Sequence, residues 1–216
     1  MTQDILDIYT DYLISQNQYA TATGLSKLLD GQISHDKITR FLNSNEYGSK
    51  DLWQYVKPEV RKHEKDKGGV LIIDDSIEEK PYTDENEIVG WHFSHAKGRC
   101  VKGINLLSSL VRYDDIAFPI AFEVIVKDRH FCDLKTRKEK RQSSVTKNQH
   151  FRALIKQAVS NQIKFDYVLA DNWFGAKDNM EFIHYELKKM FVLGMKTNRL
   201  IALSEEERKN GQYQNL

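Results

Sequence analysis

Apolar residues recur at two different spacings along the chain, and the change of spacing divides the chain into two regions. Over the first sixty-odd residues they follow a helical period, as at Ile5 and Ile8, without strand-like alternation. Beyond the Gly68-Gly69 pair, short β-branched and aliphatic runs replace this period. The pattern predicts a small helical domain at residues 1–66 and a mixed α/β domain at residues 67–216.

In the second region, short apolar runs alternate with segments of helical period. Strands are expected at residues 70–73, 101–111, 116–126, 167–170 and 191–195, and helices at residues 151–162 and 180–190. The second and third strands flank Tyr113-Asp114-Asp115 and are expected to pair antiparallel beside the first. The order β-β-β-α-β-α-β is that of a ribonuclease H-like α/β fold.

Within the helical region, two short helices separated by a glycine are expected. Residues 22–30 precede a break at Gly31, and Ser34 is a suitable N-cap for the second helix. This is the outline of a helix-turn-helix, whose second helix presents its first side chains to the DNA major groove. Ser34, Lys37 and Arg40 are then the candidate DNA contacts. A plain helical hairpin that packs on the next domain would give the same pattern.

The overall charge does not indicate a nucleic-acid partner, because 32 basic and 31 acidic residues leave a formal charge of +1. Any basic surface must therefore be local. Residues 127–147 hold eight basic and three acidic side chains, a local excess suited to the DNA backbone. The candidate phosphate contacts there are Lys135, Arg137, Lys138 and Arg141. An ordinary solvated loop is the alternative.

Cysteine usage and apolar run length indicate a soluble cytoplasmic protein. Cys100 and Cys132 lack CxxC spacing and a disulfide framework, which predicts reduced structural thiols. The N-terminus lacks the features of a secretory leader. No apolar run approaches the roughly 20 residues of a membrane span, so no membrane partner is expected.

Two of the expected strands end in an acidic residue. Asp74 follows Val70–Ile73, and Asp171 follows Tyr167–Ala170. If the two strands are neighbours, their carboxylates share one edge of the sheet and can hold a divalent cation. Asp75 would point to the opposite face from Asp74, so only one of the two can join Asp171. We favour Asp74, with Asp75 as the alternative; an Asp that merely caps a turn would explain either strand alone.

Two further motifs lie close to these acids in the sequence. His92 and His95 have a spacing compatible with zinc, but no cysteine or further histidine cluster accompanies them, so a solvated turn is expected. Trp173 and Phe174 follow the second acidic strand. Core packing is expected for both, and stacking on a nucleobase is the alternative.

Several of these segments resemble one known family, the DDE transposases of bacterial insertion sequences. The matching segments are Ile72–Ser76 with Lys80-Pro81, Gly90–Arg99, Gly103–Asn105 and Val168–Phe174. The resemblance extends over about residues 34–200. It implies a ribonuclease H-like catalytic domain that cuts DNA and joins it to a target.

The resemblance also assigns roles to individual residues. Asp74 and Asp171 match the first two catalytic carboxylates, which with a third would hold two Mg²⁺ (or Mn²⁺) ions. Lys97 and Arg99 lie in a matching segment and are candidate phosphate contacts. The implied partners are the DNA of the element's ends and target, with a homodimer assembled on it.

The family's third carboxylate, a glutamate seven residues after a tyrosine, has no match, because Val192 stands seven residues after Tyr185. Glu205, Glu206 and Glu207 lie in a segment without an apolar face and are expected to be solvated. We therefore expect a transposase fragment that is inactive alone. The alternatives are a non-catalytic DNA-binding remnant and a structure-specific nuclease.

Overall fold

The computed structural model describes residues 5–17, 19–44 and 46–215, and the chain forms two compact units, Met1–Tyr47 and Gly48–Leu216. The first unit contains the helices α1 (Ile5–Ser15), α2 (Ala22–Leu28) and α3 (His35–Ser44). Its small core is formed by Tyr12, Leu25 and Ile38.

The turn between α2 and α3 has the chemistry expected from the sequence. Gly31 adopts φ +75° and its N–H bonds the Ser26 carbonyl at 2.9 Å, which ends α2. Ser34 Oγ accepts a hydrogen bond from the Lys37 N–H at 3.3 Å, so the predicted N-cap is confirmed. Ile38 is fully buried, whereas the Ser34, Lys37 and Arg40 side chains face solvent.

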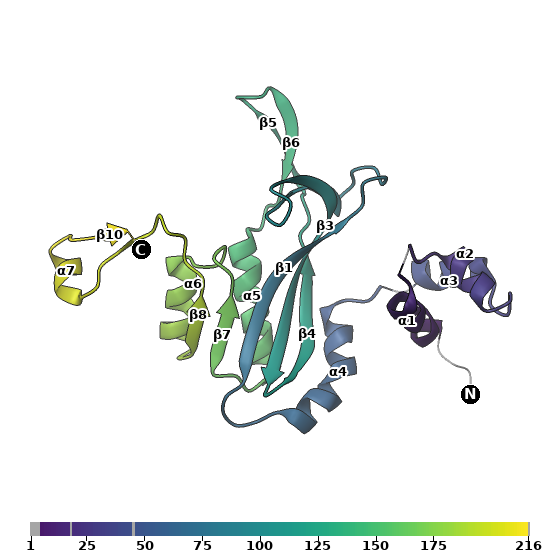
Figure 1. The fold of residues 1–216 in the computed structure, drawn as a ribbon, viewed down its shortest axis with the longest axis horizontal. Helices are drawn as coiled ribbons and strands as arrows, with labels where there is room; N and C mark the ends of the chain where they lie inside the picture. The colour runs from purple at the N-terminus through teal and green to yellow at the C-terminus, as the bar shows by residue number, and fades with distance from the viewer. Residues whose placement is uncertain (1–4, 18, 45, 216) are drawn as a thin grey trace. The chain divides into compact units, whose positions relative to one another are not determined.

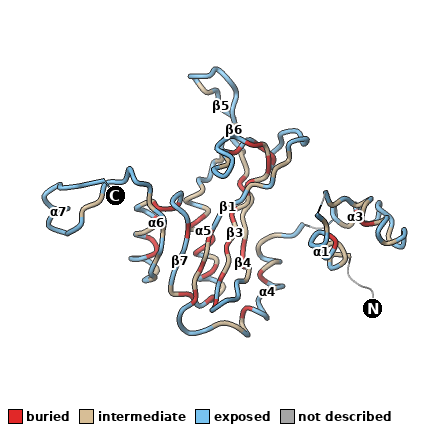
Figure 2. Tube along the Cα trace, viewed as in Figure 1, coloured by how far each residue is buried: buried red, intermediate tan, exposed pale blue. Residues whose placement is uncertain are grey.

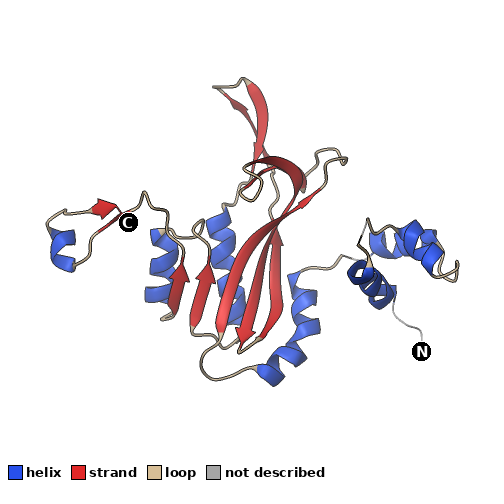
Figure 3. Cartoon of the chain, in the orientation of Figure 1, coloured by secondary structure: helices blue, strands red, loops and turns tan. Residues whose placement is uncertain are grey.

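The second unit is a mixed α/β structure (Figures 1 and 3). Its elements in chain order are α4 (Ser49–His63), β1 (Val70–Glu79), β2 (Val89–Ser94), β3 (Arg99–Tyr113), β4 (Ile116–Val124), β5 (Arg129–Asp133), β6 (Lys138–Gln142), α5 (Lys147–Ser160), β7 (Tyr167–Ala170), α6 (Lys177–Glu181), the π-helix η1 (Phe182–Glu186), β8 (Met190–Leu193), β9 (Leu200–Ile201), α7 (Glu205–Lys209) and β10 (Gln214–Asn215).

The main sheet has the order β2-β3-β1-β7-β8, with β4 also paired to β3. β3 is antiparallel to β1, β2 and β4, whereas β1, β7 and β8 run parallel. The elements β1, β3, β4, α5, β7, α6 and β8 thus follow the predicted β-β-β-α-β-α-β order of a ribonuclease H-like fold. β2 was not predicted as a strand; it pairs with the first part of the long β3, whose second part pairs with β4.

One face of the sheet carries the core. Leu71 and Ile73 of β1 are fully buried and belong to one cluster with Phe151 and Leu154 of α5. The alternation follows from the strand geometry, because successive side chains point to opposite faces. Buried residues accordingly run along the strands and the inner side of α5 (Figure 2). On the other face, apolar side chains of β7 and β8 remain exposed, namely Tyr167, Leu169, Met190 and Val192.

α4 belongs to the sheet unit, which corrects the predicted domain boundary at residue 66. Its Trp53 and Val60 are buried in the main core cluster. The compact sheet unit therefore begins at Gly48. The sequence showed the helical period of α4 but not what that apolar stripe packs against.

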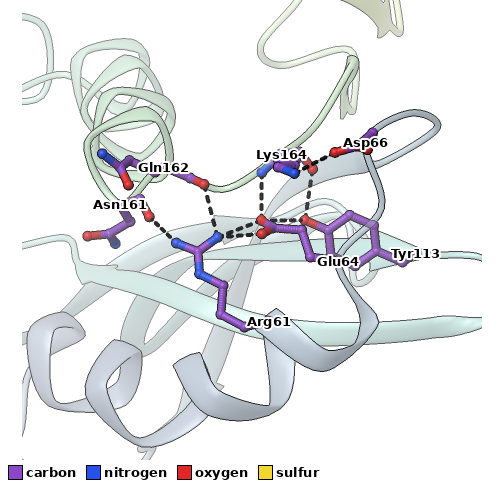
Figure 4. Close-up of polar contacts among 7 residues, drawn as sticks. All are labelled: Arg61, Glu64, Asp66, Tyr113, Asn161, Gln162 and Lys164. Atoms are coloured by element: carbon purple, nitrogen blue, oxygen red, sulfur yellow. Dashed lines mark hydrogen bonds and ion pairs between the residues drawn. The ribbon is translucent and has the colours of Figure 1, made fainter.

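A polar network fastens the end of α4 to the rest of the unit (Figure 4). Arg61 donates to Glu64 Oε2 at 2.6 Å and to the Asn161 carbonyl at the end of α5, also at 2.6 Å. Glu64 Oε1 accepts the Lys164 N–H at 2.8 Å. Tyr113 Oη donates to the Lys164 carbonyl at 2.7 Å. The bond from Arg61 satisfies the Asn161 carbonyl, one of those that the end of α5 leaves free.

The basic segment at residues 127–147 contains a β-hairpin rather than an open loop. β5 and β6 pair antiparallel in a sheet of their own, and the hairpin extends beyond the end of the main sheet (Figure 1). Arg137 adopts φ +52° in the turn, and its N–H bonds the Asp133 carbonyl at 2.7 Å. His130 and Glu139 form an ion pair across the strands at 2.6 Å.

The predicted helix at residues 180–190 is shorter and irregular. α6 continues into the π-helix η1, and β8 already begins at Met190. Phe182 and Ile183 are buried in the main core, so the turn is wound to place both side chains inward. Within the part of the chain that is described, no helix combines the length and apolar character needed to cross a bilayer.

Candidate active site

Asp74 and Asp171 lie at the same level of two neighbouring parallel strands, where Asp171 follows the end of β7 and Asp74 lies inside β1, which continues to Glu79 beyond the predicted residues 70–73. β1 and β7 are paired with Ile73 opposite Ala170, so the next residue of each chain segment is an aspartate. Ile73 and Ala170 are buried toward the core, and alternation directs the two aspartates to the opposite, open face of the sheet. The structure therefore brings together the two acids that the sequence paired.

The turn after β7 fixes the Asp171 carboxylate. Its Oδ1 accepts the Trp173 N–H at 3.0 Å, a hydrogen bond typical of an aspartate that opens a turn. Phe174 is fully buried and stacks on Phe151 with ring centroids 4.8 Å apart. Gly175 passes so close to the end of β8 that a Cβ there would lie 2.2 Å from the Gly194 carbonyl oxygen. The turn is thus anchored on both sides.

Negative charge concentrates at Asp74. Partial burial raises the pKa of its carboxyl, and the charges of Asp75 and Asp171 raise it further. The Asp75 N–H donates to Asp74 Oδ1 at 2.9 Å and opposes this effect. The carboxylates of Asp75 and Asp171 beside a partly buried Asp74 mark a place where a bound cation would be stabilised.

Asp75 has the opposite surroundings and does not share this face. Its Oδ2 accepts hydrogen bonds from Asn105 Nδ2 at 3.1 Å and from the ammonium of Lys147, with which it forms an ion pair. Burial alone would raise the pKa of Asp75, but these two donors outweigh burial and hold it below its ordinary value. Asp75 therefore ties the middle of β1 to the first residue of α5, and the alternative in which it faces Asp171 is wrong.

The donor atoms fit a divalent cation of the Mg²⁺ or Mn²⁺ type. Asp74 and Asp171 offer only carboxylate oxygens, which are the ligands these ions prefer. In residues 5–17, 19–44 and 46–215, no cluster of three or more acidic, histidine or cysteine side chains could hold a metal. The described residues thus supply two carboxylates of a site, and Glu205, Glu206 and Glu207 of α7 do not complete it.

His92 lies on β2 and is buried, so the predicted solvated turn is wrong for this residue. Burial lowers its pKa to about 4, and the charges of Lys127 and Lys147 act in the same direction. His95 does lie in the exposed turn after β2, with its ring 5.1 Å from that of Phe93. The sequence did not reveal that His92 is buried and His95 exposed, because β2 is too short to show a clear alternation of apolar and polar residues.

Trp173 is not part of the core, which corrects the expectation from the sequence. It is 42% exposed, in contrast to the buried Phe174 beside it. Two lysines far apart in the chain approach its indole: Lys147 Nζ lies 5.6 Å and Lys196 Nζ 5.0 Å from the ring centroid. Neither lysine stood out in the sequence, because only the fold brings the start of α5 and the segment after β8 to this turn.

The remaining basic candidates are spread over several surfaces. Lys135, Arg137 and Lys138 are exposed in the β5–β6 hairpin, whereas Arg141 is half-buried and donates to the Asn86 carbonyl at 2.8 Å. Lys97 and Arg99 are exposed around the β2–β3 turn, and Lys97 forms an ion pair with Glu79 at 2.6 Å. Arg141 therefore also holds the hairpin in place.

The chain was compared with known families and proteins. No curated protein matched it. A family model described as DDE superfamily endonuclease matches residues 1–214, nearly the whole chain. Two carboxylates directly after the paired residues of neighbouring parallel strands, in a ribonuclease H-like sheet, agree with this match. The chain belongs to the DDE superfamily endonucleases, and its family is one of nuclease-type enzymes.

Proposed function

We propose that this chain is a DNA transposase of a cut-and-paste insertion sequence, in which Asp74 and Asp171 hold the metal ions for phosphodiester cleavage and strand transfer. The observation that carries the proposal is the register of β1 and β7, in which the last paired residues, Ile73 and Ala170, are each followed by an aspartate. The electrostatic coupling of the two carboxylates supports a shared role.

Each neighbouring residue contributes to holding these carboxylates in place. When bound, two Mg²⁺ (or Mn²⁺) ions would activate the attacking oxygen and stabilise the leaving oxygen at phosphorus. Asp171 is oriented by the Trp173 N–H, and Asp74 by the Asp75 N–H. The Asp75–Lys147 ion pair fixes β1 against α5. Rigid support of this kind is what a metal site needs from the protein.

DNA is the proposed partner, and two surfaces are its proposed contacts. The exposed side chains at the start of α3, Ser34, Lys37 and Arg40, would read the major groove. The basic hairpin and the residues Lys97 and Arg99 would contact phosphates. Assembly on DNA as a homodimer would place a carboxylate pair at each end of the element.

Metal binding tests the site directly. We expect the chain to bind Mn²⁺, measured by electron paramagnetic resonance of the free ion. Asp74→Asn and Asp171→Asn should each weaken binding about tenfold or more, because one charged ligand is lost while the side-chain size is kept. Asp84→Asn is the matched control, since Asp84 is an exposed loop aspartate. Equal Mn²⁺ affinity in all four proteins would refute the assignment of the site.

A non-catalytic DNA-binding remnant is the second candidate, favoured by the missing third ligand among the described residues. We therefore propose that these 216 residues alone do not cut DNA. Labelled DNA carrying the element's ends would be incubated with the chain and Mn²⁺. Nicks at the ends that disappear in Asp74→Asn would contradict this inactivity and support the transposase, whereas nicks at branched DNA without ends would indicate a structure-specific nuclease.

A further inference from the structure

Trp173 keeps part of its side chain in solvent on a turn whose next residue is buried. Its neighbour Phe174 takes the core position, whereas Trp173 is 42% exposed. The backbone N–H of Trp173 bonds Asp171 Oδ1 at 3.0 Å, so the indole is set at a defined position beside the carboxylate pair. A large aromatic side chain held in water on a rigid turn is a typical binding anchor.

Positive charge surrounds this indole from two separate segments. The ammonium of Lys147, at the start of α5, lies 5.6 Å from the ring centroid, and that of Lys196, after β8, lies 5.0 Å from it. Both distances are within the range of cation–π attraction. The ring of His95, from the turn after β2, lies 5.9 Å away. Four segments that are distant in sequence thus converge on one exposed aromatic ring.

An aromatic face flanked by cations matches the chemistry of a nucleotide. The base can stack on the indole when the ammonium groups that lie over the ring move aside to the phosphates. We propose that Trp173, with Lys147, Lys196 and His95, forms a binding site for an unpaired nucleotide beside the Asp74–Asp171 pair. The inference rests on the proposed function and specifies the form of DNA that this part of the site takes.

The nucleotide must be unpaired because of the geometry of stacking. Inside a duplex both faces of each base are covered by neighbouring base pairs, so the indole can stack there only on a base turned out of the helix, whereas a single-stranded end offers unpaired bases without that cost. Trp173 stands two residues from Asp171, so the nucleotide it holds is adjacent to the phosphate that the carboxylates would address. The substrate class is therefore DNA with a single-stranded end.

Fluorescence anisotropy of labelled DNA, in EDTA to prevent cutting, tests the site. The probes are a blunt duplex and the same duplex with a short single-stranded overhang. We expect the chain to bind the overhang probe more tightly, by on the order of tenfold, from one stacked base. Trp173→Ala should remove this preference. Trp173→Phe, which keeps an aromatic face, should retain part of it.

Two further variants make the outcome decisive. Lys196→Ala changes a loop residue and should reduce the preference severalfold with an unchanged Tm. Trp91→Ala removes another exposed tryptophan, on β2, and should leave the preference intact. An undiminished preference in Trp173→Ala, or equal affinity of the unaltered chain for both probes, would overturn this inference alone. Absence of any DNA binding by the chain would overturn the proposed function together with it.

Discussion

Two adjacent aspartates at β1 show how strongly the pleat of a strand separates neighbouring side chains. Asp74 points to the open face, where burial and like charges raise its pKa. Asp75 points to the core side, where Lys147 and Asn105 lower its pKa. One residue of register therefore decides between a carboxylate that repels its neighbours and one that is neutralised by a partner. Only Asp74 has a carboxylate that is not already paired with a lysine and can therefore bind a metal cation.

His92 provides a test at the same scale. Its pKa is lowered from 6.5 to about 4 in the folded chain by burial, with Lys127 and Lys147 adding to the shift and Asp75 opposing it. The unfolded chain then binds a proton more readily, so stability is fully present above pH 6.5 and declines as the pH falls toward 4. We expect this residue to contribute on the order of 2 kcal/mol to that decline.

Urea unfolding of His92→Leu should show a smaller loss of unfolding free energy than the unaltered chain between about pH 7 and pH 5. The substitution removes the titrating group and keeps an apolar side chain on the buried face of β2. His184→Leu, at an exposed position in η1, should keep the original pH dependence. Identical slopes for His92→Leu and the unaltered chain would show that His92 does not cause the effect.

At the scale of elements, the basic hairpin of β5 and β6 is separate from the main sheet that carries the two aspartates. β5 and β6 bond only to each other as a sheet, and cross-strand ion pairs such as His130–Glu139 stabilise them. The exposed cations at its tip are Lys135, Arg137 and Lys138. A hairpin of this kind can offer several cations to a phosphate backbone without disturbing the core.

The hairpin prediction concerns salt dependence. A triple variant should bind duplex DNA of every sequence more weakly. Its substitutions are Lys135→Ala, Arg137→Ala and Lys138→Ala. They should also reduce the slope of log affinity against log salt by up to about three units, roughly 0.9 for each phosphate that the variant no longer neutralises. Arg141 is left in place because it bonds the Asn86 carbonyl.

Filter binding over a series of salt concentrations measures this slope. The matched control removes three exposed lysines elsewhere, Lys50, Lys57 and Lys209, and should change the slope much less. A triple hairpin variant whose slope equals that of the control would exclude the hairpin from DNA contact. Changes at Lys37 or Arg40 of α3 should instead alter the preference between sequences.

At the scale of the whole molecule, the chain consists of two compact units, and α4 belongs to the second. Trp53 and Val60 are only 7% and 0% exposed within the core of the sheet unit. Residues 48–216 should therefore unfold cooperatively with nearly the Tm of the whole chain. A fragment of residues 67–216 lacks α4 and should be less stable by at least about 3 kcal/mol, because a large apolar face is uncovered.

Thermal unfolding followed by circular dichroism compares the two fragments with the whole chain. Limited proteolysis gives an independent check, since the first cuts should fall near the boundary between the units at residues 47 and 48. Equal stability of the fragments 67–216 and 48–216 would place α4 outside the sheet unit, contrary to the structure.

Local sequence patterns determined much of the fold and the position of the two acids. The runs before Asp74 and Asp171 are β-branched and aliphatic and so predict strands there, although β1 continues past Asp74 to Glu79 through its pairing with β3. The Ser34 cap and the glycine break before it depend on residues within one turn. Period and capping act over a few residues, and that is why the order of elements and the candidate pair could be predicted before any tertiary contact was known.

Tertiary structure alone decided which segments meet. It made β2 a strand by pairing it with β3, which buried His92, and it joined α4 to the sheet. It also left Trp173 exposed and brought Lys147 and Lys196 to its ring. These outcomes depend on contacts between segments far apart in the chain, and such contacts leave no local period in the sequence from which they could be predicted.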